Sequence, residues 1–447
     1  MTKASKLYSP TIGLELHVEL STNSKMFCGC DNQHFGIKPN THTCPVCLGL
    51  PGALPVPNKK AVDWTLMIGL ALKSRINRES KFDRKHYFYP DLPKGYQISQ
   101  YDEPFCTDGY LETSKGKVRI TRVHLEEDTG KLIHRKVKGR DVTLIDFNRS
   151  GVPLVEVVTE PDIRSAAHAK EVAQSIRHHI RWLEVSECEM EKGSMRIEAN
   201  VSLRTQNNKL ADYKVEVKNI NSFRYLEKAI NYEIGRQTKL LSNGKKVKQE
   251  TRGWDEVGNK TKSQRYKETA SDYRYFPEPD IPPIKFSSSF IKEIRESLPE
   301  VSKEYELRFK DKYRVPVQYI KVLTETSGIA HYAEEALALA LASKRDVSAK
   351  DVASKIVNRI VDVKKVSPKS LVDEIRKQKV EKVTDKDVLA KWADKAIDSV
   401  PKAVADYKKG KTTAIAALIG KVMKLSKGKA DAARVKSIFE SKLKKSK

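Results

Sequence analysis

The sequence predicts an α+β domain built on an antiparallel sheet, followed by an all-α domain and a basic α-helical tail. Two observations predict this class. Residues 11 to about 160 are rich in β patterns and turns, whereas from Ser287 onward Lys, Glu and Ala recur at helical spacing. We therefore expect three domains in the 447 residues, at 1–290, 291–382 and 383–447.

The first predicted strand, residues 13–20, alternates polar and apolar residues without a break. Neighbouring side chains on a strand point to opposite faces, so Glu15, His17 and Glu19 share one face. Side chains on one face lie about 6 to 7 Å apart, close enough for two of them to hold one cation if other acids converge. A solvated strand face is the alternative reading.

Later strands offer the acidic partners that such a site needs. The predicted strand 118–128 ends in three consecutive carboxylates, and single glutamates stand among apolar or β-branched residues of the predicted strands 152–158, 194–201 and 213–219. A lone ionised carboxylate in a buried strand is costly unless it is paired or bound to a metal. Several strands that each contribute one carboxylate can build an oxygen-rich site of the kind magnesium prefers. These glutamates are Glu126, Glu156, Glu198 and Glu216.

Helical spacing of apolar residues predicts helices over about 58–73, 164–183 and 223–241, between the strands. Farther on, residues 415–423 carry an apolar stripe flanked by lysines, which predicts a helix with one buried and one basic face. Gly410, Lys411 and Thr412 resemble part of a phosphate loop. Ala405 occupies the place of its first glycine and no strand precedes it, so we reject that reading.

Four of the six cysteines are clustered between residues 28 and 47. Two short pairs separated by thirteen residues have the spacing of two metal-binding knuckles. We expect a structural zinc site with four cysteine ligands, and His34 and His42 as ordinary loop residues. Cys106 and Cys188 are isolated and are expected to be small buried hydrophobes. The expected zinc ligands are Cys28, Cys30, Cys44 and Cys47.

Two segments combine aromatic and basic residues. Residues 85–97 suit stacking on a base with phosphate contact, although a hinge packed by its own aromatic rings fits equally well. Residues 262–280 could bind phosphate. From these and from basic residues of the neighbouring strands we expect ligands for the phosphates of a nucleotide. They are Arg196, Lys218, Arg265, Lys267 and Arg274.

The formal net charge is +26, and the last 47 residues hold 14 Lys and Arg against 3 Asp and Glu. A concentrated positive field favours a polyanion, with nucleic acid the leading candidate. A merely solubilising lysine-rich surface is the alternative. No apolar run of membrane-spanning length occurs, and residues 1–10 carry no hydrophobic signal core, so we expect a cytoplasmic protein.

Taken together, the motifs resemble one family, the B subunits of the tRNA-dependent amidotransferases. The similarity is long and specific between residues 12 and 285 and looser in the C-terminal third. It rests on residues 13–20, 48–52, 87–91, 96–100, 124–128, 146–154, 249–254 and 272–280.

The resemblance implies a catalytic "cradle" domain, a helical domain and a tRNA-binding tail. It implies ATP- and Mg²⁺-dependent phosphorylation of the side-chain carboxylate of Glu or Asp misacylated on tRNA-Gln or tRNA-Asn. Ammonia from a glutaminase A subunit would then displace the phosphate, and a small C subunit would complete a heterotrimer. The archaeal E-type paralogue is an alternative, although no room for its inserted domain is evident between Asp280 and Ser287. A non-catalytic zinc-containing tRNA-binding scaffold is another.

By matching position, the resemblance implies catalytic residues that also bind magnesium, namely Glu15, His17, Glu126, Glu156 and Glu216. Glu198 stands at the edge of this site, where many relatives have Asp. Glu19 is not expected to touch the metal. Many relatives lack the four cysteines, so catalysis should not require zinc.

Overall fold

The structure is a computed structural model that describes residues 8–205, 211–266, 273–343, 347–380, 383, 385–426 and 428–444. The chain forms two compact units. One comprises Met1–Glu300 with Glu325–Ser327, and the other Val301–Thr324 with Gly328–Lys447. A large, mostly antiparallel sheet followed by helices confirms the predicted fold class.

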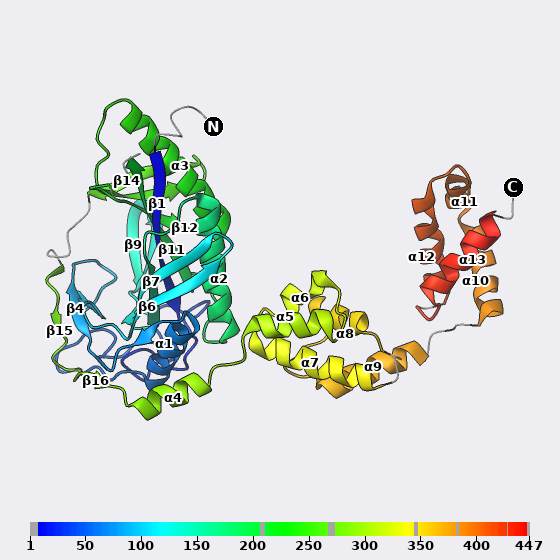
Figure 1. Cartoon of the computed structure of the whole chain (residues 1–447), viewed down its shortest axis with the longest axis horizontal. Coiled ribbons are helices and arrows are strands. Elements are labelled where there is room, and N and C mark those ends of the chain that lie inside the picture. Colours follow the sequence, from blue (N-terminus) through cyan, green and yellow to red (C-terminus); the bar gives the residue numbers. More distant parts are fainter. Residues whose placement is uncertain are drawn as a thin grey trace. The chain divides into compact units, whose positions relative to one another are not determined.

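A nine-stranded sheet forms the centre of the first unit (Figure 1). All neighbouring strands run antiparallel except β12 and β13. The predicted alternating strand is β1, which lies in the middle of the sheet between β10 and β11. The spatial order is β14 (Lys260–Tyr266), β13 (Glu250–Asp255), β12 (Val215–Ile220), β11 (Met195–Thr205), β1 (Tyr8–Glu19), β10 (Pro153–Thr159), β7 (Gly116–Glu127), β6 (Cys106–Thr113) and β2 (Arg75–Ile76).

Three small sheets accompany the large one. The predicted aromatic loop, residues 85–97, begins on β4 and ends on β5. These two strands pair with each other, so the two ends of the loop lie side by side. The hairpin β8–β9 is largely exposed. These sheets consist of β15 (Phe276–Pro277), β4 (Asp83–His86) and β5 (Tyr96–Ser99); of β16 (Ile284–Lys285) and β3 (Glu79–Ser80); and of β8 (Lys131–Val137) and β9 (Arg140–Asp146).

Helices α1 (Lys59–Ala71), α2 (Ala166–Trp182) and α3 (Phe223–Ser242) confirm the three helices predicted between the strands. Each begins at a polar cap whose side chain accepts backbone hydrogen bonds, namely Asn58, Ser165 and Ser222. They pack with the apolar face of β1 into one core, in which Leu14, Leu16 and Val18 are fully buried. The helices therefore cover one face of the sheet and leave the face with Glu15 and His17 for other contacts.

Helix α4 (Ser288–Glu296) lies in the first unit, and the second unit is helical. Helices α10, α12 and α13 share a small core that includes Leu389, Leu418 and Phe439, so the predicted apolar stripe of α12 is confirmed. No helix in the described ranges has both the length and the apolar character needed to cross a bilayer. The helices are α5 (Ser302–Asp311), α6 (Val317–Leu323), α7 (Ser327–Ala342), α8 (Ala349–Val357), α9 (Pro368–Val380), α10 (Lys386–Ser399), α11 (Pro401–Lys408), α12 (Ile415–Leu425) and α13 (Ala432–Lys444), with a 3₁₀ turn η3 (Thr412–Ala414).

Candidate active site

The sheet register brings the predicted acidic residues together on the face opposite the helices. His17 of β1 stands directly across from Glu156 of β10, and Glu15 of β1 stands across from Glu198 of β11. Paired residues on antiparallel strands point to the same face, with Cβ atoms about 4.5 to 5.5 Å apart. Glu216 of β12 and Glu126 of β7 extend the set on either side. The result, called here the acidic row, crosses five adjacent strands.

The acidic row is divided into two groups of three. In each group the ligand atoms lie within 4.8 Å of one another. The first triad is His17, Glu126 and Glu156, and the second triad is Glu15, Glu198 and Glu216. All six residues expected to bind magnesium therefore lie in the acidic row, with Glu198 a full member of the second triad. Strand β1 contributes to both triads, because Glu15 and His17 are neighbours on the same face.

In the first triad, His17 Nε2 lies 3.3 Å from Glu156 Oε2 and 3.8 Å from Glu126 Oε1. Burial opposes protonation of His17, but the charge of Glu156 and its hydrogen bond raise the pKa of the imidazole to about 9. Ser99 Oγ donates to Glu126 Oε2 at 2.9 Å. Without a bound cation, a protonated imidazole between two buried carboxylates therefore stabilises the triad, and a bound magnesium ion would take the place of that proton.

His124 of β7 is a member of this environment that the sequence analysis did not find. It is buried, and its Nε2 lies 3.2 Å from Glu156 Oε2 and 3.6 Å from Glu126 Oε2. Arg122 Nε donates to His124 Nδ1 at 3.3 Å, so that Nε2 is the nitrogen that carries a proton toward the carboxylates. The sequence contains one signal for it: His124 precedes Glu126 by two residues and therefore shares its face.

In the second triad, each carboxylate has a polar neighbour that fixes it. Asn200 Nδ2 donates to Glu15 Oε1 at 2.7 Å, and Thr251 Oγ1 donates to Glu216 Oε2 at 2.6 Å. Lys218 Nζ lies 2.9 Å from Glu198 Oε2 and 4.0 Å from Glu216 Oε1. Burial, followed by repulsion from neighbouring carboxylates, raises the pKa of Glu15 above its ordinary value.

These donor sets fit magnesium. Carboxylate oxygens are the hard ligands that it prefers, usually together with waters and nucleotide phosphates. Buried carboxylates that repel one another are unfavourable without a compensating cation. In the first triad the imidazole of His17 lies against Glu126 and Glu156. Beside the second triad the ammonium of Lys218 lies against Glu198 and Glu216.

Of the residues expected to bind phosphate, Arg196 and Lys218 lie at the acidic row. Arg196 of β11 is paired with His17 in the register and binds Asp128 through its guanidinium, while its Nε is buried without a hydrogen-bond partner. Arg274 is exposed, with a left-handed backbone at φ 45°. Arg265 lies on β14, but its side chain and the whole of Lys267 are outside the described residues.

Two cavities flank the acidic row along β1. One, of about 390 Å³, is lined by Glu15, Asn200 and Tyr213 among others. The other, of about 540 Å³, is lined by Glu19 and His34. Glu19 belongs to neither triad, and its Oε2 lies 2.8 Å from His34 Nε2. The first cavity therefore reaches the row at Glu15, whereas the second lies beside Glu19 and is lined by no triad residue.

Lys85 is a second residue that the sequence analysis did not assign to the site. It lies on β4 with its ammonium 5.1 Å from the ring centre of Tyr273 and 5.8 Å from that of Tyr87. Burial opposes its charge, but the acidic groups around it, which include Glu126 and Glu156, raise its pKa. Its only sequence signal is the basic start of the aromatic loop. The rings of Tyr87 and Tyr273 thus lie against the ammonium of Lys85 near the first triad.

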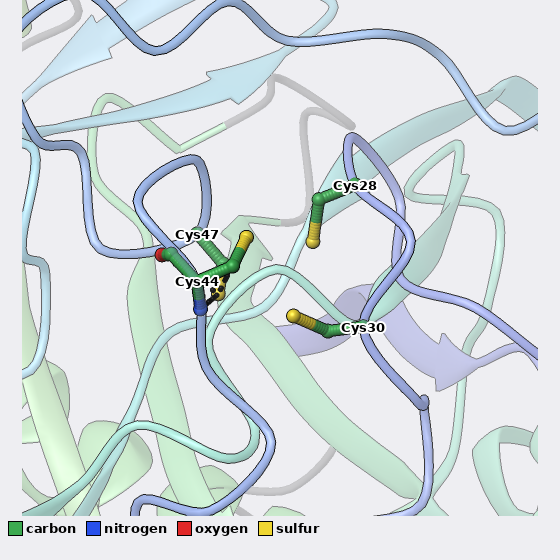
Figure 2. Close-up of side chains that lie close together, drawn as sticks. All are labelled: Cys28, Cys30, Cys44 and Cys47. Atoms are coloured by element: carbon green, nitrogen blue, oxygen red, sulfur yellow. Dashed lines mark hydrogen bonds between the residues drawn. The ribbon is translucent and has the colours of Figure 1, made fainter.

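The four clustered cysteines converge in space, as Figure 2 shows. Their sulfur atoms lie within 4.8 Å of one another, with 3.9 Å between Cys44 Sγ and Cys47 Sγ. Zinc with tetrahedral bonds of about 2.3 Å would hold sulfur atoms about 3.8 Å apart, so the residues fit zinc. Hydrogen bonding from Cys28, against the effect of burial, lowers the pKa of the Cys47 thiol to about 5. We call these four residues the cysteine centre.

The other residues of this segment lie as expected for loop and core positions. His34 contacts Glu19, and His42 Nδ1 lies 2.7 Å from the carbonyl oxygen of Gln33, so neither belongs to the cysteine centre. Cys106 and Cys188 are fully buried.

Comparison with known proteins adds two family models. The model described as the GatB/GatE catalytic domain matches residues 10–292, and the model described as the GatB domain matches residues 329–443. The first matched segment contains the acidic row and the cysteine centre.

Curated relatives match along nearly the whole chain. The B subunit of the aspartyl/glutamyl-tRNA(Asn/Gln) amidotransferase of Caldicellulosiruptor bescii is 42% identical over 480 aligned positions, and the match covers 98% of this chain and 99% of the relative. A B subunit of the same amidotransferase from Clostridium acetobutylicum is 42% identical with the same coverage. That of a Thermotoga species is 42% identical over 95% of this chain and 96% of its own length.

Proposed function

The chain belongs to the family of the aspartyl/glutamyl-tRNA(Asn/Gln) amidotransferase B subunits, and on that premise we propose that it activates the side-chain carboxylate of glutamate or aspartate misacylated on tRNA-Gln or tRNA-Asn. ATP phosphorylates this carboxylate, and ammonia from a glutaminase partner then converts it to the amide. The observation that carries the proposal is the acidic row, which gathers two triads that could each hold a cation on one face of the sheet.

The chemistry explains why such a face is needed. The substrate carboxylate attacks the γ-phosphorus of ATP, giving an acyl phosphate and ADP, after which ammonia attacks the acyl carbon and phosphate leaves. The first step brings an anion up to a polyanion, so that positioning and charge neutralisation dominate catalysis. Magnesium, held by the two triads, would neutralise phosphate oxygens during transfer.

The chain's own residues orient the reactants. Arg196 of β11 and Lys218 of β12 are placed to hold phosphate oxygens, and Arg196 has an unpartnered Nε available for that purpose. His124 donates from Nε2 and holds Glu156 and Glu126 in the orientation that a cation requires. As the sequence predicts, Arg265, Lys267 and Arg274 are further candidates for phosphate contacts.

The cysteine centre binds zinc structurally. It lies outside both triads and supplies no ligand to them. The division of the helical part into 291–382 and a tRNA-binding tail at 383–447 follows from the separate core of α10, α12 and α13 and from the basic charge of the last 47 residues. Since aminoacyl-tRNAs are the substrates, we place the activity in the cytoplasm.

The partners are an amidase A subunit and a small C subunit. The relatives that match the whole chain are named B subunits, which favours this assignment over the E-type paralogue. A non-catalytic tRNA-binding scaffold would gain nothing from carboxylates that repel phosphate, so the acidic row favours catalysis.

The test is reconstitution of the full-length chain with the A and C subunits of a relative. Amidation of glutamate-charged tRNA-Gln and of aspartate-charged tRNA-Asn is measured with ATP, Mg²⁺ and glutamine. We expect at least one tRNA to be amidated and one ADP to be formed per amide. A complex that hydrolyses glutamine but amidates neither tRNA would contradict the proposal.

A further inference from the structure

Lys25 is the largest fully buried side chain that carries a charge in the described part of the chain, with 0% of its surface exposed. Its ammonium donates to the carbonyl oxygen of His42 at 2.7 Å and to that of Phe147 at 3.3 Å. The third contact is Cys47 Sγ at 3.7 Å. A buried ammonium is costly unless an anion and hydrogen-bond acceptors compensate it.

The sulfur of Cys47 is the group that can serve as the anion beside Lys25 when a metal is bound. In the described residues, no carboxylate lies within ion-pair distance of Lys25, in contrast to Lys94, which binds Glu127. Four thiolates around a divalent cation carry a net charge of −2. The ammonium of Lys25 balances half of this charge and donates an N–H to one of the four sulfurs.

The segment 146–151, which begins at the last residue of β9, contacts the loop that carries the cysteine centre. His42 N donates to Asn148 Oδ1 at 2.8 Å, and Asn148 Nδ2 donates to the carbonyl oxygen of Lys38 at 2.8 Å. Ser150 Oγ donates to the carbonyl oxygen of Cys47 at 3.1 Å. Together with the bond from Lys25 to Phe147, these contacts attach 146–151 to Cys47 and to the loop that carries the cysteine centre.

The segment 146–151 in turn supports the edge of the acidic row. It carries Arg149, which donates to the carbonyl oxygens of Thr129 at 2.9 Å and Gly130 at 2.8 Å. Arg149 Nε also lies 3.7 Å from Asp128 Oδ2, and Asp128 binds Arg196 beside His17. A continuous set of contacts therefore leads from the cysteine centre to the arginine beside the first triad.

We propose that Lys25 is the internal counter-cation of a metal-loaded cysteine centre and joins that centre to the segment 146–151. Occupancy of the centre by a metal then determines how firmly Arg149 and Asp128 are held. Lys25 is a positioning residue, since it touches neither substrate nor triad. The inference rests on the zinc assignment within the proposed function and is independent of the amidation reaction.

The first experiment measures zinc affinity in the full-length chain by competition with a chromophoric chelator. Lys25→Met keeps an apolar side chain of similar length and removes the charge. The matched control is Lys38→Met, which removes an equal charge from an exposed position in the loop between Cys30 and Cys44. We expect Lys25→Met to weaken zinc binding about 10- to 100-fold and Lys38→Met to change it less than twofold. Equal affinities for Lys25→Met and the unmodified chain would overturn the proposal.

The second experiment uses the unmodified chain, so that it does not depend on a variant that folds. Amide hydrogen exchange is followed with zinc bound and after its removal. We expect faster exchange in residues 146–151 without zinc and unchanged exchange in α3. Unchanged exchange in 146–151 would remove the proposed link. A chain that binds no zinc at all would refute the zinc assignment itself, whereas amidation is tested separately by reconstitution.

Discussion

The acidic row and the cysteine centre are both sets of metal-binding side chains, yet they are built in opposite ways. The cysteine centre takes all its ligands from 20 consecutive residues of an irregular loop. The acidic row takes its ligands from five strands whose residues span positions 15 to 216. A local site depends on a few turns, whereas the row depends on the register of the whole sheet.

The two sites also differ in how their charge is balanced. The cysteine centre has a fully buried lysine of its own. In the second triad, burial, followed by repulsion from neighbouring carboxylates, raises the pKa of Glu15, so ionisation of this carboxylate adds negative charge that its neighbours do not compensate. Such a charge is suited to a site that takes up cations with its substrate, whereas a site with its own buried counter-cation is suited to a permanent metal.

The largest expected effect is the loss of the acidic row's chemistry. Glu126→Gln and Glu156→Gln each remove one charge from the first triad, and we expect amidation to fall about 10²- to 10³-fold or more. Affinity for tRNA should stay nearly unchanged, because neither residue is basic or exposed. The measurements are amidation in the reconstituted complex and tRNA binding by the same protein.

Glu112→Gln is the matched control, since Glu112 is an exposed carboxylate on β6 of the same sheet. It should leave amidation within twofold. Full activity in both triad variants would show that the first triad is not the catalytic site.

A smaller effect is expected for Lys218→Met in the second triad. If Lys218 holds a phosphate oxygen, its loss removes a charge-assisted contact worth about 1.5 to 3 kcal/mol, and the KM for ATP rises about 10- to 100-fold. The kcat should change less. An unchanged KM with a lowered kcat would mean that Lys218 serves only to neutralise Glu198 and Glu216.

The cysteine centre should affect activity less than either triad. Cys44→Ser removes one of four thiolates, and we expect bound zinc to fall from about one per chain to nearly none. The melting temperature should fall, while amidation below that temperature decreases less than about tenfold, through looser positioning of 146–151. Loss of activity as complete as that of Glu156→Gln would mean that the two sites are not separate.

The smallest expected effect is on the free energy of unfolding, and it compares Glu250, a carboxylate paired with an arginine, with Glu15 of the second triad. Glu250 of β13 is bound by Arg252 at 2.8 Å and by Ser263 at 2.5 Å. Burial opposes ionisation of Glu250, but these contacts lower its pKa. The carboxylate therefore stabilises the fold above the ordinary pKa of 4.5, and this stabilisation is lost as the pH falls through the lowered pKa. Glu15 has a raised pKa, so stability is lost as the pH rises from the ordinary value through the raised one.

At pH 7 without divalent cations, Glu250→Gln should therefore decrease the free energy of unfolding by about 1 kcal/mol or less. Glu15→Gln should increase it by about 1 kcal/mol. Added Mg²⁺ should stabilise the unmodified chain and the Glu250 variant more than the Glu15 variant. Denaturant unfolding with chelator and with Mg²⁺ measures all three. A Glu15→Gln variant that is destabilised in chelator would disprove the excess of negative charge.

The contrast between the two sites explains what the sequence could predict. The cysteine spacing pointed to the cysteine centre, because its ligands are close in the chain. Alternation in residues 13–20 identified Glu15 and His17 as sharing a face, but only the register of β1 against β10 and β11 shows that they serve different triads. His124 shares a strand face with Glu126, but only tertiary contacts show that it reaches Glu156 as well, and the single buried Lys25 has no spacing pattern at all.

The central position of β1 has a consequence for synthesis. β1 precedes the other strands of this sheet in the sequence, but its two neighbours, β10 and β11, begin at residues 153 and 195. Until they have been made, a strand with one apolar face and two unpaired edges must stay out of reach of other chains. Pairing of β1 therefore has to wait until synthesis has passed residue 195, and the two triads can form only after that point, unlike the local cysteine centre.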